Sequence, residues 1–270
     1  MAIVARSIGT GVGRDYSSVS AWESDLADTS IYASGDIAEG NCYADSEFNE
    51  NIYISGTFDL SGIVLTVAAS DRHDGTVGSG VIIKPSNTGA YAFDIYESDV
   101  TVSWIEINGN DSSPYGLQFG TGATGGYVQN CLVHNFGSAS GASVDVYVMR
   151  NRSSVNFTNN FIFNNTSGSS ADLFIHYSDS GVPSYSYNNT YYYNNVYDST
   201  SNDGYIFYGT LEDSASVVKN IVVLRYEDNL WNAKHASATL DYWGAVGAIT
   251  GVSNVTTDTF VNSFIAIWTD

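Results

Sequence analysis

The chain has 270 residues, of which 43% are hydrophobic and 14% are charged, and 29 acidic residues against 9 basic ones give a net charge of −20. Because contact with phosphates needs lysine and arginine, this balance argues against nucleic-acid binding. No apolar run approaches the length of a membrane-spanning helix, so we predict no membrane insertion. The simpler explanation of the acidic excess is solubility in a salty medium, and calcium binding is the more specific alternative.

The first 35 residues are predicted to form an entry segment and a cap. Residues 1–6 are too short for the apolar stretch of a signal peptide. We therefore expect a protein at a virion surface or outside the cell that carries no secretion signal, since virion proteins leave by lysis. Residues 9–13 form a glycine-rich turn without the spacing of a phosphate-binding loop.

Residues 17–26 carry the one clear helix signal of the chain. Val19, Trp22, Glu23 and Leu26 follow helical spacing and make a narrow apolar stripe. Ser18 or Ser20 is suited to begin this helix as its N-cap. The simplest role for a single amphipathic helix before a run of strands is to cover the open first turn of the fold.

Short β-prone runs follow from residue 36 onward. Four are predicted as strands, at residues 37–39, 50–54, 63–68 and 81–84. A charged loop at residues 71–75 lies between the last two, and its His73 is expected to be a solvated surface residue. From Tyr91 a repeat becomes visible, with Phe93 and Ile95 pointing one way and Asp94 and Tyr96 the other.

One line of sequence returns at a spacing of about thirty residues, each time as a β-prone run with asparagine at its edges. Its copies are residues 129–135, 159–165, 189–195 and, slightly shifted, 220–225. A second line runs between them, at residues 143–147, 172–176 and 204–208. A fixed period of this size indicates one unit stacked on copies of itself.

The unit contains runs too short for helices, separated by residues that tolerate tight bends, so we predict an all-β fold, a parallel β-helix. An antiparallel sandwich is the main rival, but it gives no reason for asparagine to recur at one phase. In a β-helix those asparagines can stack at a bend and hydrogen-bond along the stack. The predicted domains are the entry and capping helix at 1–35, the β-helix at 36–228 and a C-terminal closing strand or oligomer contact at 229–270.

The parity of the asparagine-edged line predicts its core and its surface. Aligned by their asparagines, the copies place one set of side chains inside: Cys131, Val133, Phe161, Phe163, Tyr191, Tyr193, Val222 and Leu224. The set predicted to point outward is Leu132, Ile162, Tyr192 and Val223. A contiguous apolar stripe of this kind usually marks an interface, so we expect self-association. The alternative cover is the protein's own C-terminal segment, which supplies Phe264, Ile265, Ile267 and Trp268.

The second line and its neighbours supply the candidate glycan site. Tyr96, Tyr147 and His176 are predicted to point outward, with Asp94 and Asp145 one step away. An exposed aromatic row beside acceptor groups can stack on sugar rings and bind their hydroxyls. Exposed tyrosines that merely cover the sheet are the simpler alternative.

Metal and cysteine chemistry have few candidates. Asn108, Asn110 and Asp111 cluster in one turn whose oxygen atoms could hold calcium, although an ordinary Asn-Gly turn without a metal is the simpler interpretation. Cys42 and Cys131 lie far apart in the sequence, and Cys131 falls on a core position. We predict buried free thiols and no disulfide framework. No other cofactor is expected.

Several segments together carry a resemblance: the opening glycine-rich turn, the helix at 16–23, the segment at 41–48 and the turn at 72–75. They resemble right-handed parallel β-helix proteins of phage and marine metagenomic sequences, over about residues 7–225. Phage tailspikes, fibres and head decorations share that fold, as do pectate lyases and polygalacturonases. The resemblance implies the fold strongly and the function weakly, and the likeness to tailspikes favours a trimer as the form of the expected self-association.

The enzyme alternative lacks the motifs of these families. The chain has no adjacent aspartate pair and no histidine flanked by glycine on both sides, which the polygalacturonase pattern needs. Arg150 and Arg152 flank one coil, but no acidic cluster of matching phase accompanies them. We therefore predict a non-enzymatic structural or binding protein on a virion, which contacts other virion proteins and surface polysaccharide. A polysaccharide lyase or hydrolase, and an extracellular adhesin or filament subunit, are the alternatives.

Overall fold

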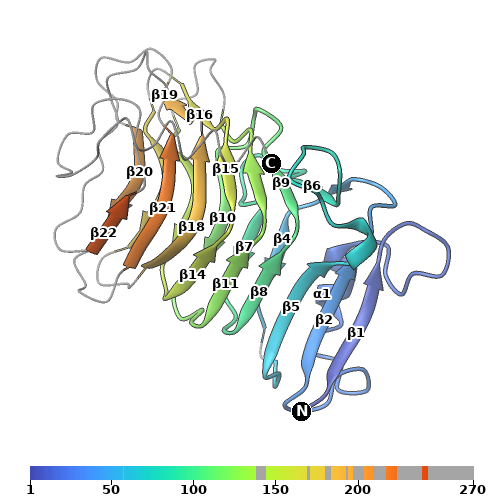
Figure 1. The fold of residues 1–270 in the computed structure, drawn as a ribbon. Coiled ribbons are helices and arrows are strands. Elements are labelled where there is room, and N and C mark those ends of the chain that lie inside the picture. The colour runs from blue at the N-terminus through green and yellow to red at the C-terminus, as the bar shows by residue number, and fades with distance from the viewer. Residues whose placement is uncertain are drawn as a thin grey trace.

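The computed structural model describes residues 1–56, 58–137, 144–168, 171–179, 184–192, 194–196, 204–209, 217–223 and 239–242. Within these residues the protein is an all-β fold with one short α-helix and one 3-10 helix, η1 (Ala69–Asp71). The strands lie side by side along an elongated molecule, from β1 at one end to β22 at the other (Figure 1). Every pair of strands among the described residues is parallel, which excludes the antiparallel sandwich for this part of the chain.

The strands fall into two main sheets, and the larger one contains two rows. The first row is β1 (Ile3–Ile8), β2 (Ile37–Cys42), β5 (Gly62–Val67), β8 (Val100–Ser103), β11 (Gly126–Gln129) and β14 (Val155–Thr158). The second row is β3 (Phe48–Asn49), β6 (Ile82–Lys84), β9 (Glu106–Asn108), β12 (Leu132–His134) and β15 (Phe161–Phe163). The long strand β18 (Ser184–Tyr192) pairs with β14 and with β15, so it joins both rows, and β21 (Val217–Val223) and β22 (Thr239–Tyr242) continue beyond it.

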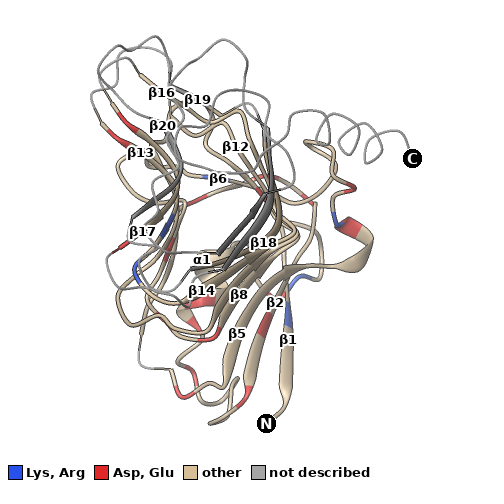
Figure 2. Ribbon diagram, turned by 60° about the vertical axis from the view of Figure 1, so that its left-hand side comes forward, with Lys and Arg blue, Asp and Glu red and all other residues tan. Residues whose placement is uncertain are grey.

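The smaller main sheet has six strands and faces the larger one. Its members are β4 (Ile52–Ile54), β7 (Phe93–Ile95), β10 (Tyr115–Phe119), β13 (Val146–Asn151), β17 (Leu173–Ser178) and β20 (Gly204–Gly209). In Figure 2, β13 and β17 lie on one side of the molecule and β5, β8 and β18 on the other. A third sheet pairs β16 (Thr166–Ser167) with β19 (Asn195–Val196). None of the described segments forms a helix long and apolar enough to cross a membrane.

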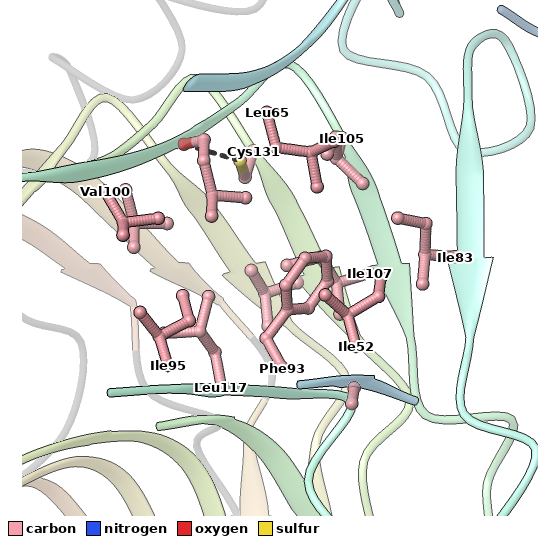
Figure 3. Packing of buried hydrophobic residues seen from close by; sticks show 14 of the residues in the cluster. Ile52, Leu65, Ile83, Phe93, Ile95, Val100, Ile105, Ile107, Leu117 and Cys131 are labelled. Atoms are coloured by element: carbon pink, nitrogen blue, oxygen red, sulfur yellow. Dashed lines mark hydrogen bonds between the residues drawn. The ribbon is translucent and has the colours of Figure 1, made fainter. Parts of the chain in front are cut away.

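One apolar core fills the space between the sheets. Phe93 and Leu117 from the six-stranded sheet and Ile107 from the second row are fully buried and pack into this common interior (Figure 3). Burial of such side chains is the main source of folding free energy. Both cysteine thiols are buried and free, as predicted, and burial raises the pKa of Cys131 to about 12.

Asparagine makes the bends at which the chain passes from one row to the next. Asn130, Asn159 and Asn188 follow the first row, and each has a positive φ, of 55°, 56° and 53°. Asn135 and Asn164 do the same after the second row, at 58° and 52°. Asparagine tolerates this left-handed conformation better than other residues with a side chain.

The asparagines that follow Asn159, Asn164 and Asn188 are buried and form ladders along the molecule. Asn160 donates from Nδ2 to the Asn189 Oδ1 of the next repeat at 2.9 Å and to Val128 O at 3.0 Å. Its own Oδ1 accepts from Cys131 N at 3.0 Å. A second ladder links Asn165 to Asn194 at 2.8 Å in the same way. The predicted stacking of asparagines along the molecule is therefore confirmed at two bends.

The predicted helix is confirmed as α1 (Val19–Ser24). Ser18 is its N-cap, and the Ser18 hydroxyl accepts from Ala21 N at 3.1 Å. Val19 and Trp22 are buried, and the helix contacts β1, β2 and β4. Since β1 pairs with β2, the parallel sheet already begins inside the segment 1–35 that was predicted as entry and cap.

The register of the asparagine-edged line differs from the predicted one by one residue. Val133 pairs with Ile162, and Ile162 with Tyr191, at a spacing of 29 residues rather than thirty. Because side chains alternate along a strand, a slip of one residue moves each to the opposite face. Val133 and Tyr191 are in the core as predicted, but Phe161 and Phe163 are not; they are half-buried on the outer side.

The apolar stripe predicted for self-association is consequently wrong for the residues that can be assessed. Ile162 is fully buried in the core, and Leu132 is 2% exposed. The side chains of Tyr192 and Val223, and residues Tyr193 and Leu224, lie outside the described part of the chain, as do Phe264, Ile265, Ile267 and Trp268.

Candidate functional site

The outer face of the six-stranded sheet gathers the candidate site, which we call the tyrosine face. Its side chains form three columns across the strands. The first column is Tyr91, Tyr115, Tyr147 and Phe174; the second is Tyr53, Asp94, Gln118, Arg150 and Tyr177; the third is Tyr96, Gly120, Arg152 and Asp179.

The first column is a ladder of aromatic rings stacked on one another. The ring centroids of Tyr147 and Phe174 are 4.9 Å apart, and those of Tyr115 and Tyr147 are 6.4 Å apart. Tyr91 extends the ladder beyond Tyr115 at 5.1 Å. Their ring faces are turned toward each other, so the ladder stabilises the sheet and leaves mainly ring edges for a ligand.

Among the side chains of this face that the structure describes, the exposed rings are Tyr53 and Tyr96, at one end of the sheet. Tyr53 is 56% exposed and Tyr96 is 37% exposed, with ring centroids 5.8 Å apart. Gly120 makes room for Tyr96, because a Cβ atom there would lie 2.3 Å from the Tyr96 ring. These rings are the parts of the face available for stacking on a ligand.

Two hydrogen-bonded sets of polar groups lie on the same face as the exposed rings. Gln118 donates to the Asp94 carboxylate at 2.8 Å. Asp179 accepts from Arg152 Nε at 2.7 Å and from Arg150 Nη2 at 3.4 Å. The Arg150 guanidinium also lies over the Tyr147 and Tyr177 rings at 5.3 and 5.1 Å, a cation–π arrangement. Sequence reasoning found both arginines but missed Asp179, which holds them together across one strand pair.

Electrostatics on this face are set mainly by partial burial. Desolvation raises the pKa of Asp94, although the hydrogen bond from Gln118 opposes the shift. Burial, followed by the nearby charge of Asp145, raises the pKa of Tyr147 to about 12. Tyr147 therefore keeps its hydroxyl proton at neutral pH, and the Asp94 carboxyl accepts the hydrogen bond from Gln118.

The predicted glycan residues are only partly brought together. Asp94, Tyr96 and Tyr147 lie on the tyrosine face as expected. Asp145 is half-buried just before β13, where it accepts from Asp172 N at 3.1 Å. It does not lie in the column of Asp94, because the strand register aligns Asp94 with Gln118 and Gln118 with Arg150.

His176 is a correction, because it faces the core and is 2% exposed. Its ring lies 4.5 Å from that of Phe157, and its Nε2 is 3.1 Å from Asn151 Oδ1. The reason is a break in alternation: Ile175 and His176 are consecutive and both point inward, as Val148 and Met149 do in the neighbouring strand. Sequence periodicity alone does not reveal such a break.

The turn predicted to hold calcium uses part of its own oxygen set. The Asn108 side-chain oxygen accepts from Asn110 N at 2.9 Å, and Asn110 and Asp111 have positive φ values of 57° and 53°. Among the described residues, no three His, Cys, Asp or Glu side chains are grouped as a metal site. Calcium binding at Asn108, Asn110 and Asp111 stays a prediction.

Comparison of the chain with models of known protein families, with curated proteins and with solved structures gives no match in any of the three.

Proposed function

We propose that the protein is a glycan-binding protein, built as a right-handed parallel β-helix, that binds a polysaccharide on its tyrosine face. The observation that carries this proposal is the pairing of two exposed rings, Tyr53 and Tyr96, with a hydrogen-bonded set of polar groups on the same face. Sugar rings present an apolar face and a rim of hydroxyls, and such a surface complements both.

The β-helix proposal is supported by the repeating geometry. Parallel pairing at a spacing of 29 residues recurs in both rows of the large sheet, and two amide ladders bond the same bend of successive repeats. Stacked coils of one unit give this arrangement directly.

The role of each group follows from its position. Tyr53 and Tyr96 provide ring faces for stacking. Asp94 binds hydroxyls beside them while the buried Gln118 holds its carboxylate in place, and Arg152 provides a fixed donor because Asp179 holds its guanidinium. The resemblance to phage tailspikes, fibres and head decorations, together with the tyrosine-rich and charge-poor composition, supports display on a virion surface.

A polysaccharide hydrolase is the second candidate, and one observation favours it. Asp94 is a half-buried carboxyl with a raised pKa on the face proposed to bind sugars, which is a property of general acids. In this case Asp94→Asn would abolish the release of new reducing ends while glycan binding persisted.

The test is a glycan-array screen with wild-type protein, followed by titration of the strongest ligand into Tyr96→Ala and Tyr127→Ala. Tyr127 is the matched control, an exposed tyrosine on β11 of the large sheet, 44% exposed. We expect Tyr96→Ala to weaken binding at least about tenfold, as loss of an aromatic anchor does. Equal affinity for all three proteins would refute binding at this face, and a reducing-end assay on the same ligand separates binding from hydrolysis.

A further inference from the structure

A groove of about 520 Å³ lies on the large sheet, at the bend between its first and second rows. The loop from His73 to Thr76 forms one wall, and Trp104, Asn130, Asn159 and Asn188 lie along the floor. Its volume is within the range of sites for small ligands. The groove shares no residue with the tyrosine face.

Trp104 occupies a bend position that asparagine fills in the following repeats. Ser103 pairs with Gln129, so Trp104 corresponds to Asn130, and the same register continues to Asn159 and Asn188. All four have positive φ, and that of Trp104 is 63°. A bulky side chain is strained in this conformation, whereas asparagine is well suited to it. Strain of this kind is concentrated at functional positions, and here it places an indole ring in a groove.

The groove wall holds that indole in a fixed position. The Arg72 guanidinium lies 4.8 Å from the centre of the Trp104 ring, and the His73 ring lies 5.7 Å from it. His73 was predicted to be solvated but is 7% exposed, and its Nε2 donates to Asn130 O at 2.8 Å. Its Nδ1 is buried and has no hydrogen-bond partner among the described residues, so the wall contains an unused acceptor.

A buried pair fastens the loop that carries this wall. Glu106 accepts from Gly78 N at 2.6 Å and lies 3.0 Å from His134 Nε2, and both side chains are buried. Gly80 closes tightly on the loop, since a Cβ atom there would lie 2.6 Å from His73 N. The groove is therefore shaped before any ligand arrives, which lowers the cost of binding.

The chemistry of the floor selects an uncharged ligand that carries hydroxyls. Asn159 and Asn188 are exposed, and their carboxamides follow one another at the strand spacing of about 4.8 Å. Arg72 lies beside the groove with its guanidinium over the Trp104 ring and its Nε donating to Val67 O at 3.3 Å, and the described residues that line the groove itself include no lysine or arginine. The carboxylate in that lining, Asp74, is bonded within its own turn to Thr76 N and Ser79 Oγ at 2.9 Å each. An anionic ligand would meet Asp74 and a protein of net charge −20.

We propose that this groove is a second carbohydrate site, which binds a short stretch of neutral glycan with one ring against Trp104 and hydroxyls on Asn159 and Asn188. The site is independent of the tyrosine face, whose polar groups include Arg150 and Arg152.

The test uses maltotetraose, cellotetraose, laminaritetraose and N-acetylchitotetraose as neutral probes and trigalacturonate as the anionic one, measured by saturation-transfer NMR and calorimetry. Trp104→Asn installs the residue that the next three repeats use at this bend, so it keeps the left-handed conformation with less strain. Asn159→Gly also keeps the conformation while it removes a single carboxamide. We expect at least one neutral probe to bind, trigalacturonate not to bind, and Trp104→Asn to weaken binding at least about tenfold.

Tyr96→Ala and Tyr127→Ala are the controls, and both should bind the neutral probe as wild type does. If Trp104→Asn fails to fold, Asn159→Gly carries the comparison, with an expected loss of severalfold. The proposal is overturned if no neutral probe binds, if the probe binds the folded variants as tightly as wild type, or if only Tyr96→Ala weakens it. The last result would place the binding on the tyrosine face instead.

Discussion

At the scale of single residues, His176 shows how burial couples this fold to pH. Desolvation lowers the pKa of its imidazole from the ordinary 6.5 to about 3. In the unfolded chain the same ring takes up a proton near pH 6.5. The unfolded state therefore binds more protons between these two values, and the contribution of His176 to stability is present above about pH 6.5 and is lost as the pH falls.

We predict that the melting temperature falls as the pH is lowered from 6.5 to 5, a window above the titration of most carboxylates. His176→Gln should give a flatter profile over that window, because glutamine can still donate to Asn151 but does not titrate. Thermal melts at half-unit pH steps measure both slopes. Parallel profiles for the two proteins would show that His176 does not contribute.

At the scale of elements, the amide ladders tie each bend to the next. Asn160 has a buried side chain that donates to two acceptors and accepts from Cys131 N, whereas Asn159, its neighbour, is exposed. We predict that Asn160→Ala costs at least about 2 kcal/mol, because it leaves several buried groups without partners. Chemical denaturation measures the difference in free energy of unfolding.

The matched control is Asn159→Gly, which keeps the positive φ and removes no ladder contact. It should change stability by less than about 1 kcal/mol. If Asn160→Ala lowers the free energy of unfolding no more than Asn159→Gly does, the ladder contributes little to stability and the apolar core alone holds the repeats together.

The same asparagine pairs explain what the sequence could and could not predict. The strands, the capping helix, the parallel stacking and the recurrence of asparagine at bends were all readable from composition and period. The register was not, because Asn159-Asn160 and Asn164-Asn165 are doublets in which one member is a solvated bend residue and the other a buried ladder residue. Side-chain type does not distinguish the two, and an error of one residue in the alignment assigned core side chains to the surface and surface side chains to the core.

The candidate site was predictable only in part for a related reason. Asp94 and Tyr96 follow simple alternation from Phe93 and Ile95 and were placed correctly. Beyond Val148 the alternation breaks, so His176 was assigned to the wrong face. The groove was missed because it joins a loop near residue 73 to bends of four later repeats, and no local pattern connects them.

At the scale of the whole molecule, Ile162 and Leu132 cannot form the contacts of the predicted trimer, because both are buried within the chain. Self-association stays a prediction that rests on the resemblance to tailspikes. Light scattering should give the mass of three chains of 29.0 kDa each. A mass of one chain across the accessible concentration range would exclude the trimer.

Ile162→Asp cannot serve as an interface variant in that experiment. It buries an unpaired carboxylate in the core and should prevent folding altogether, which circular dichroism would detect.

The ladders also constrain how this protein changes length in evolution. From β11 to β18, 29 residues separate one bend from the next, and the buried ladder asparagines bond to one another at that interval, Asn160 to Asn189 and Asn165 to Asn194. Duplication or loss of one whole interval preserves each of these bonds, whereas an insertion of any other size within a row leaves amides unmatched. Insertion or deletion of a whole repeat therefore changes the length of the molecule by one strand spacing, about 4.8 Å, and leaves the packing of its interior unchanged.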